Sequence, residues 1–347
     1  MNHQFYMQQC IDLALKGIGN VAPNPMVGAV LVHDDKIIGE GWHRQYGEAH
    51  AEVNCINSVA ANHQHLIAES TLYVNLEPCN HTGKTPPCTD FILQHGIKKI
   101  VVGCVDANPL VGGKGIAKLK TNNCHVVYPI LEKENIELNK RFFTFHQKKR
   151  PYIFLKYAQT KDRFIAADNY NAIKISNNLV DEKMHEMRSH EAAIMVGYNT
   201  AWHDNPRLTA RLTNSTHQPL RIVIDRQNKL PVSHHLLSDK LATLILNEVV
   251  NKHENNKEYL RLDFNYLLPH LMNELYKRNI NSMIVEGGAI LLQNFINENL
   301  WDEAIVITNT ELSIHHGIDA PILIAKPNTS ITAENNCINY FRNTNTI

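Results

Sequence analysis

The residues that decide the fold of the first half of the chain are His50-Ala51-Glu52 and Glu77-Pro78-Cys79, with Cys88 nine positions after Cys79. Zn²⁺ prefers imidazole nitrogen and cysteine thiolate as ligands, and a catalytic zinc site keeps three protein ligands so that water can hold the fourth position. His50, Cys79 and Cys88 supply those three ligands. Glu52 is a carboxylate beside them that is not needed as a ligand, so the sequence predicts a hydrolytic zinc site.

The flanking sequence favours this site over the alternative that these are ordinary packed or solvated side chains. Apolar residues at helical spacing place His50 and Glu52 in the first turn of an amphipathic helix. These residues are Ala49, Val53, Ile56 and Ala60. The apolar run over residues 71–76 predicts a strand that ends just before Cys79, where functional loops commonly lie. We therefore expect Glu52 to carry a proton from the zinc-bound water to a leaving amine, as in zinc deaminases.

Length and composition predict a two-domain enzyme that acts on a small molecule. The 347 residues exceed one core of ordinary size, and 44% of them are hydrophobic. The 34 basic residues equal the 34 acidic ones, so we expect neither nucleic acid nor a membrane as partner. The seven cysteines fit reduced thiols and a metal site better than a disulfide framework. The sequence shows neither the pattern of a secretory signal nor a long apolar span, so we expect a cytoplasmic protein. We also expect a homo-oligomer.

Strands alternate with helical patterns in both halves, which predicts two α/β domains, over residues 1–147 and 151–347. The first half has predicted helices over residues 5–15 and 89–95, and predicted strands over 27–32, 37–39, 71–76 and 100–105. The second half has predicted strands over 152–158, 192–196, 220–225, 242–246 and 282–285. The basic stretch 147–150 is interpreted as a solvated linker, and the polar segment 250–262 as a solvated loop.

One turn in the second half is a candidate ligand site. Val285-Glu286-Gly287-Gly288 joins a predicted strand to a helical pattern over residues 289–300. Such a turn lets backbone N–H groups at the helix start meet a phosphate or a ribose. A purely structural turn is the alternative. The segment lacks the Gly-x-Gly-x-x-Gly pattern, so a Rossmann domain is not predicted.

The spacing of the two cysteines separates this chain from plain cytidine or adenosine deaminases. Those enzymes have Cys-x-x-Cys, whereas residues 80–87 intervene here. The string from Glu77 to Cys88 resembles the deaminase half of the bifunctional riboflavin-biosynthesis pyrimidine deaminase/reductase family. Further strings of the chain that resemble that family in order are Ala22-Pro23-Asn24-Pro25-Met26-Val27-Gly28, Gly39-Glu40-Gly41-Trp42-His43, Asp106-Ala107-Asn108-Pro109 and Gly112-Gly113-Lys114-Gly115.

The resemblance implies a cytidine-deaminase-like three-layer α/β/α domain followed by a dihydrofolate-reductase-like α/β domain that uses NADPH. It implies deamination of a diaminopyrimidinone ribosylamino phosphate to an aminouracil, and then reduction of its ribose to a ribityl chain. In the second half it rests on strings such as Lys156-Tyr157-Ala158, His185-Glu186-Met187-Arg188-Ser189 and Asp204-Asn205-Pro206-Arg207-Leu208.

The same resemblance implies roles for individual residues. Implied cofactor contacts are Ala158, Thr200, Asp204, Glu286, Gly287 and Gly288, and implied substrate contacts are Asn24, Arg188, Leu208 and Arg211, with His43 as a further pocket residue. The two arginines suit a phosphate, because guanidinium offers bidentate hydrogen bonds to its oxygens; a surface salt bridge is the alternative. Apart from the resemblance, Lys156 is a candidate general acid for the reduction, with a lysine at the edge of the core as the equal alternative.

Departures from the family keep other interpretations open. The chain has Ala172-Ile173-Lys174-Ile175-Ser176 where the family has Ser-x-Trp-Ile, so a substrate hydroxyl contact and an aromatic cofactor neighbour are in question. One alternative is an active zinc deaminase whose second domain only binds a ligand or mediates assembly. A nucleic-acid base deaminase is another, and it would need a basic groove with stacking aromatics, which the balanced charge and 7% aromatic content do not favour.

Overall fold

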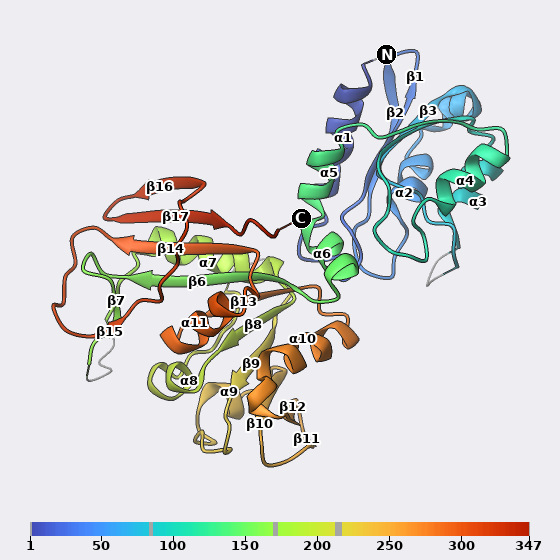
Figure 1. Ribbon diagram of the computed structural model, residues 1–347. Helices are drawn as coiled ribbons and strands as arrows, with labels where there is room; N and C mark the ends of the chain where they lie inside the picture. Colours follow the sequence, from blue (N-terminus) through green and yellow to red (C-terminus); the bar gives the residue numbers. More distant parts are fainter. Residues whose placement is uncertain (1, 83–85, 169–172, 212–216, 347) are drawn as a thin grey trace. The chain divides into compact units, whose positions relative to one another are not determined.

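The computed structural model describes residues 2–82, 86–168, 173–211 and 217–346 (Figure 1). Contacts divide this chain into two compact units, and the boundary between them in the sequence lies between Lys148 and Lys149. Each unit has its own sheet and its own hydrophobic core. Among the described residues, no helix combines the length and the apolar character needed to cross a lipid bilayer.

The first unit is built on a five-stranded sheet with the order β2-β1-β3-β4-β5. The strands are β1 (Gly28–His33), β2 (Lys36–Trp42), β3 (Thr71–Leu76), β4 (Lys99–Cys104) and β5 (His125–Val127). The helices are α1 (His3–Leu15), α2 (Ala51–Asn57), the 3₁₀ helix η1 (Ala61–Glu69), α3 (Cys88–Gln94), α4 (Lys114–Thr121), α5 (Glu132–Leu138) and α6 (Lys140–Lys148). Strand β1 is antiparallel to β2 and β3, whereas β3, β4 and β5 are parallel.

Side chains of the central strands alternate between the two faces of this sheet, as the period of a strand requires. Leu72 and Val74 of β3 pack with α2, α3 and α4 on one face. Tyr73, between them, packs with Met7 and Cys10 of α1 on the other face. Both faces are therefore covered by helices, and the predicted three-layer α/β/α domain is confirmed.

The second unit contains a ten-stranded sheet with the order β11-β12-β10-β9-β8-β13-β6-β14-β17-β16. Its strands are β6 (Tyr152–Gln159), β8 (Ala193–Val196), β9 (Leu220–Ile224), β10 (Thr243–Asn247), β11 (Lys252–Glu254), β12 (Lys257–Arg261), β13 (Ser282–Glu286), β14 (Glu303–Asn309), β16 (Thr329–Ala333) and β17 (Asn336–Arg342), and a small second sheet pairs β7 (Phe164–Ala166) with β15 (Ile318–Asp319). The helices are α7 (Asn178–His190), α8 (Tyr198–Asp204), α9 (His235–Ser238), η2 (Phe264–Tyr266), α10 (Leu267–Lys277) and α11 (Ala289–Asn297).

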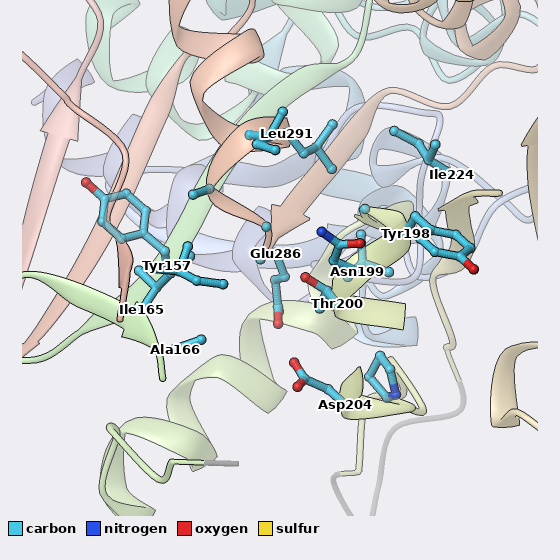
Figure 2. A pocket seen from close by; sticks show the side chains of 18 of the residues that line it. Tyr157, Ile165, Ala166, Tyr198, Asn199, Thr200, Asp204, Ile224, Glu286 and Leu291 are labelled. Carbon is cyan, nitrogen blue, oxygen red and sulfur yellow. The ribbon is translucent and has the colours of Figure 1, made fainter. Parts of the chain in front are cut away.

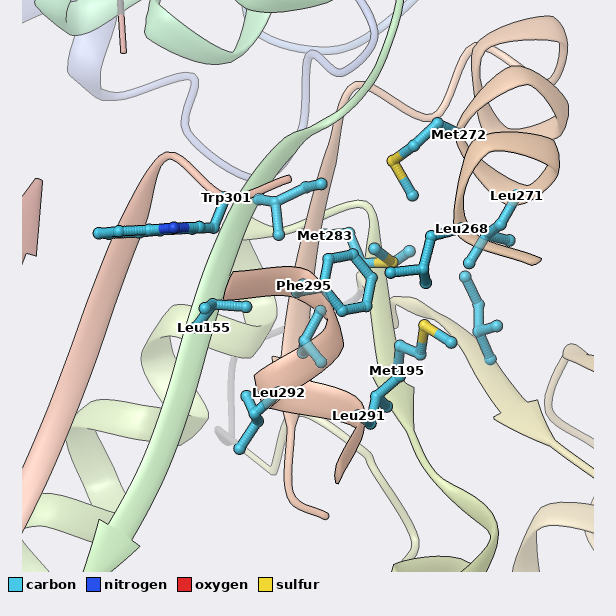
Figure 3. Close-up of a cluster of buried hydrophobic side chains, with 14 of the residues drawn as sticks. Leu155, Met195, Leu268, Leu271, Met272, Met283, Leu291, Leu292, Phe295 and Trp301 are labelled. Atoms are coloured by element: carbon cyan, nitrogen blue, oxygen red, sulfur yellow. The ribbon is translucent and has the colours of Figure 1, made fainter. Parts of the chain in front are cut away.

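The strands from β12 to β14 in this order are all parallel, and antiparallel strands β11, β17 and β16 lie at the two edges. Helices α10 and α11 cover one face, where Leu268 and Phe295 pack against Leu155 and Met195 (Figure 3). Helix α7 and the segments after β8 and β9 cover the other face. Because parallel strands have both faces buried, every residue of β13 is buried. The α/β fold predicted for this half is confirmed.

Two sequence interpretations in and beside this unit are wrong. Arg150, in the stretch interpreted as a solvated linker, is only 8% exposed, because its guanidinium donates two hydrogen bonds to the Asp302 carboxylate, at 2.5 and 2.9 Å. The segment interpreted as a solvated loop, residues 250–262, contains strands β11 and β12. Its polar residues fit a strand because they lie at the sheet edge, and the buried Lys257 amine pairs with Asp239 at 3.3 Å.

Candidate active sites

The predicted zinc ligands lie together in the first unit. Their side-chain donor atoms are all within 4.8 Å of one another, so among the described residues they form a group that could hold a metal ion. Nδ1 of His50 is 3.2 Å from Sγ of Cys88 and 3.6 Å from Sγ of Cys79. One imidazole and two thiols at these distances are a donor set that Zn²⁺ prefers, so the residues present fit that metal.

Local structure explains why ligands so far apart in the chain converge. His50 is the N-cap of α2, and Glu52 follows in the first turn. Cys79 comes after the end of β3, and Cys88 is the first residue of α3. The backbone N–H of Cys88 donates to Sγ of Cys79 at 3.3 Å, which ties the β3 exit to the start of α3. All donors are thus held by helix or strand ends.

The pKa values of the two thiol groups are shifted in opposite directions. The hydrogen bond from Cys88, together with His50 and the Cys88 backbone N–H, lowers the pKa of Cys79 to about 4. The same hydrogen bond and burial raise the pKa of Cys88. The site therefore holds one thiolate readily before any cation is present, which again suits a metal that binds thiolates.

Glu52 is 3% exposed and lines the same cavity, of about 450 Å³, as His50 and Cys79. Burial, and then the charge of Cys79, raise the pKa of this carboxyl group. Because burial disfavours the charged form, this carboxylate is a stronger base than an exposed one, which suits a group that takes a proton from water.

The predicted pyrimidine-side residues also line this cavity. Nδ2 of Asn24 is 3.2 Å from Nε2 of His43, and the His43 ring lies 5.2 Å from the His50 ring. Burial lowers the pKa of His43, so its imidazole is held neutral. A neutral imidazole beside an amide provides both donors and acceptors for a heterocyclic base.

Sequence reasoning missed the role of Glu77 at this site. Its carboxylate is 3% exposed and accepts backbone hydrogen bonds from Asp106 at 3.2 Å, Gly113 at 2.8 Å and Ile116 at 3.0 Å. Glu77 therefore anchors the loop before α4, which supplies cavity residues Asp106 and Asn108, to the segment that carries Cys79. The signal available in the sequence was an acidic residue at the end of a predicted apolar strand, directly before Pro78-Cys79.

The second unit contains a cavity of about 910 Å³ at the carboxyl ends of its central parallel strands (Figure 2). The predicted residues that line it are Ala158, Arg188, Thr200, Asp204, Leu208, Glu286, Gly287 and Gly288. Figure 2 shows Glu286 extending into the space between Ala166 and Thr200. Arg211 is described and exposed, and it does not belong to the residues that line this cavity. Open parallel sheets bind ligands at this edge.

A buried ion-pair cluster lies at the centre of this cavity. Arg188 donates to both carboxylate oxygens of Glu286, from Nε at 2.8 Å and from Nη2 at 2.6 Å. Nζ of Lys156 lies 4.0 Å from Oε2 of the same carboxylate. Burial alone would raise the pKa of Glu286, but Lys156 and Arg188 outweigh it and hold this pKa at about 2. Glu286 is therefore a fixed negative charge in the lining of this cavity.

The glycine turn has the form of a phosphate cradle. Gly287 has φ of 82°, and a Cβ added there would lie 3.0 Å from Cγ2 of Thr200. Gly288 is the N-cap of α11, and no side-chain hydrogen bond from the described residues caps this helix start. Backbone N–H groups at the start of α11 can therefore receive a diphosphate, so these residues fit a dinucleotide cofactor.

The departures from the family string are described only in part. Ala172 lies outside the described residues. Lys174 lines the cavity, but its side chain is 65% exposed and is 3.6 Å from Asp181. Asp204 is the last residue of α8, and Asn205 follows it in the left-handed conformation with φ of 41°.

Comparison with known proteins finds a matching family model for each half of the chain. Residues 1–104 match the family model of the cytidine and deoxycytidylate deaminase zinc-binding region, and residues 151–311 match that of the RibD C-terminal domain. The chain is 38% identical over 309 residues to the riboflavin biosynthesis protein RibD of Aquifex aeolicus, covering 87% of this chain and 85% of that protein. The chain belongs to the RibD family. It is 31% identical to the Escherichia coli RibD protein, over 88% of this chain and 87% of that one.

Solved structures agree with this membership. The deaminase/reductase of Thermotoga maritima superposes with a TM-score of 0.89 at 34% identity, covering 98% of both chains. RibD of Acinetobacter baumannii superposes with a TM-score of 0.89 at 29% identity, also covering 98% of both chains. The prediction of a bifunctional RibD-type enzyme of riboflavin biosynthesis, a deaminase joined to a reductase with Zn²⁺ and NADPH as cofactors, is confirmed.

Proposed function

We propose that the first unit hydrolytically deaminates C2 of 2,5-diamino-6-(5-phosphoribosylamino)pyrimidin-4(3H)-one. The second unit then reduces the ribose of the product, 5-amino-6-(5-phosphoribosylamino)uracil, to a ribityl chain with NADPH. The observation that carries the proposal is the convergence of His50, Cys79 and Cys88 within 4.8 Å, with the buried Glu52 in the same cavity.

In the deaminase, His50, Cys79 and Cys88 would hold Zn²⁺. When bound, this ion acts as a Lewis acid that makes water a nucleophile at neutral pH. Glu52 takes a proton from the attacking water at its carboxylate and returns it to the exocyclic nitrogen, so that ammonia leaves. Its raised pKa supports the first half of this exchange, because a buried carboxylate is a stronger base toward the attacking water than an exposed one. Asn24 and His43 orient the pyrimidine.

In the reductase, the start of α11 with Gly287, Gly288 and Thr200 would bind the cofactor diphosphate, and Ala158 and Asp204 would line the rest of its site. NADPH supplies the hydride. Glu286, fixed by Arg188 and Lys156, presents a carboxylate to the sugar hydroxyls. Lys156 is the candidate proton donor, because it is the ammonium group beside that carboxylate.

The substrate phosphate would bind beside Arg188, which lines the cavity, and Arg211, which is exposed and lies outside the cavity lining. Partial burial, followed by the charges of Arg188 and Arg207, lowers the pKa of Arg211, as expected for neighbouring cations. Such neighbouring cations favour a phosphate dianion. Leu208, buried and with φ of 53°, supports the apolar side of this substrate site.

The test is an assay on the whole protein with the diaminopyrimidinone substrate, in which ammonia release and NADPH oxidation are followed separately. We expect both signals in the native protein. Glu52→Gln should abolish ammonia release while leaving NADPH oxidation with the deaminated substrate. Ammonia release without any NADPH oxidation would instead mean a second unit that only binds or assembles, and the absence of both signals would contradict the assigned substrate.

We also propose that the protein works in the cytoplasm as a homo-oligomer. The seven cysteines are all unpaired, which supports a reducing compartment. Strand β16 lies at the edge of the large sheet and is mostly exposed, which supports assembly through this edge. Light scattering of the purified protein gives its mass in solution, and a monomer at all concentrations would contradict the oligomer.

A further inference from the structure

The loop over residues 43–49 joins the end of β2 to the N-cap of α2 and borders the deaminase cavity. Most of this loop is exposed, yet it supplies His43, Tyr46, Gly47 and Glu48 to the cavity lining. A loop holds side chains in a fixed geometry only when contacts from a rigid element hold the loop itself. The position of these four residues therefore depends on what ties the loop to its surroundings.

Asn54 of α2 holds both ends of this loop. Its amide nitrogen Nδ2 donates to the carbonyl oxygen of Trp42 at 2.8 Å and to that of Ala49 at 3.1 Å. Because a carbonyl oxygen can only accept, these two contacts fix which end of the amide faces the loop, and they use both of its N–H groups. Gly41 lets β2 come this close to α2, since a Cβ there would lie 2.6 Å from the backbone carbonyl carbon of Asn54. One side chain thus closes the loop at both ends.

The carbonyl oxygen of Ala49 also determines the tautomer of His43. Nδ1 of the His43 ring is 3.2 Å from this oxygen, so Nδ1 carries the proton. In the neutral ring the other nitrogen, Nε2, is then an acceptor, and the Asn24 amide nitrogen lies 3.2 Å from it. With its nitrogen facing His43, Asn24 can offer its amide oxygen to an N–H group of a pyrimidine in the cavity. Hydrogen bonds therefore connect Asn54, through Ala49 and His43, to Asn24.

We propose that Asn54 is a positioning residue of the deaminase, which fixes the loop and the His43 tautomer and thereby orients the Asn24 amide toward the pyrimidine. This inference rests on the proposed deaminase function, in which Asn24 contacts the substrate. Asn54 is absent from the described residues that line the cavity, so it acts through Ala49 and His43 and touches no reacting atom. A contact to the pyrimidine ring is made equally in the ground state and in the transition state, so its loss raises KM more than it lowers kcat.

A double-mutant cycle on the whole, zinc-loaded protein tests this role. Ammonia release from the diaminopyrimidinone substrate is measured for the native chain, Asn54→Ala, Asn24→Ala and the double variant. We expect Asn54→Ala to raise KM about 10-fold while kcat changes by less than about 2-fold. In the Asn24→Ala background the same substitution should raise KM no further, because the side chain that Asn54 orients is gone. Asn57→Ala removes an exposed amide from the same helix and is the matched control, for which KM should stay unchanged.

Zinc content and hydrogen exchange of the same variants give a second measurement. Asn54→Asp keeps the size of the side chain but presents only acceptors to two carbonyl oxygens, so it should behave like Asn54→Ala. Both variants should retain zinc, and exchange in residues 43–49 should become faster.

Three outcomes would overturn the role of Asn54. These are an unchanged KM in Asn54→Ala, additive effects of Asn54→Ala and Asn24→Ala on KM, and loss of zinc from both Asn54 variants, which would assign Asn54 to the metal site instead. A native protein that binds zinc but releases no ammonia from this substrate would overturn the proposed deaminase function itself, so the two failures are distinguishable.

Discussion

The charge of the reductase cavity is set by a few side chains. Glu286 is central among them, because its carboxylate neutralises both Arg188 and Lys156. It is 8% exposed, and both of its oxygens accept hydrogen bonds from Arg188. Removing the charge leaves Arg188 and Lys156 as unneutralised cations in a poorly solvated place. Breaking a buried ion pair from one side typically costs several kcal/mol.

We therefore expect Glu286→Gln to lower the free energy of unfolding by about 3 kcal/mol at neutral pH. The pKa of Glu286 in the folded protein, about 2, lies below its ordinary value of 4.5. Its stabilising contribution is thus complete above about pH 5 and is lost as pH falls from 4.5 toward 2. Urea titrations should show a constant difference between native protein and variant above about pH 5 and a shrinking difference below it. The exposed Glu311→Gln serves as control, and a difference independent of pH would contradict the ion-pair account.

A second prediction concerns Gly287 in the turn between β13 and α11. Gly287→Ala adds a Cβ 3.0 Å from Thr200 at a positive φ, so we expect weaker NADP⁺ binding and a stability cost of about 1–2 kcal/mol. Gly113→Ala is the matched control, since Gly113 has φ of 78° but a Cβ there has nothing within 4 Å. Calorimetry should show the loss of NADP⁺ affinity for Gly287→Ala alone. Similar affinities in the two variants would show that the contact with Thr200 does not shape the cofactor site.

Among secondary-structure elements, the exit of β3 organises the deaminase site. The Glu77 carboxylate accepts three backbone N–H groups from the loop before α4 and from its first turn. Gly115 permits this approach, because a Cβ there would lie 2.0 Å from the carbonyl oxygen of Pro78. The position of the cavity loop relative to Cys79 thus depends on one side chain.

We expect Glu77→Ala to cost about 3 kcal/mol, because it removes the acceptor of several buried donors at once. Hydrogen exchange should become faster in residues 106–116, and deaminase activity should fall while the reductase rate stays the same. Glu69→Ala, which removes an exposed carboxylate from the same unit, should have neither effect. Unchanged exchange in residues 106–116 would show that the loop is held by other contacts.

The same elements show how far the sequence alone could predict the fold. Strand β3 was predicted at residues 71–76 and β13 to within one residue, because apolar runs bounded by glycine or proline are local signals. Strands β11 and β12 were missed, because a polar edge hairpin has no such run. The contact between Arg150 and Asp302 joins residues 152 positions apart, and Glu77 contacts α4 across 39 positions. Local patterns carry no information on such pairs.

In the molecule as a whole, the predicted zinc ligands belong to the first unit, and the cavity proposed to bind NADPH belongs to the second. Each unit also has its own sheet and core, so we expect metal removal to separate the two activities. Dialysis against a chelator should abolish ammonia release, because His50, Cys79 and Cys88 then hold no ion. NADPH oxidation with the deaminated substrate should continue at its original rate.

Addition of Zn²⁺ to the chelated protein should restore ammonia release, and this recovery distinguishes metal loss from irreversible unfolding. Measuring both rates before chelation, after it and after reloading provides the internal control. If the reductase rate fell and recovered together with the deaminase rate, the folding or activity of the second unit would depend on the metal-bound state of the first. That result would contradict independent units and would indicate energetic coupling between the two sites. The coupling free energy would then be obtained from the change in NADP⁺ affinity when the metal binds.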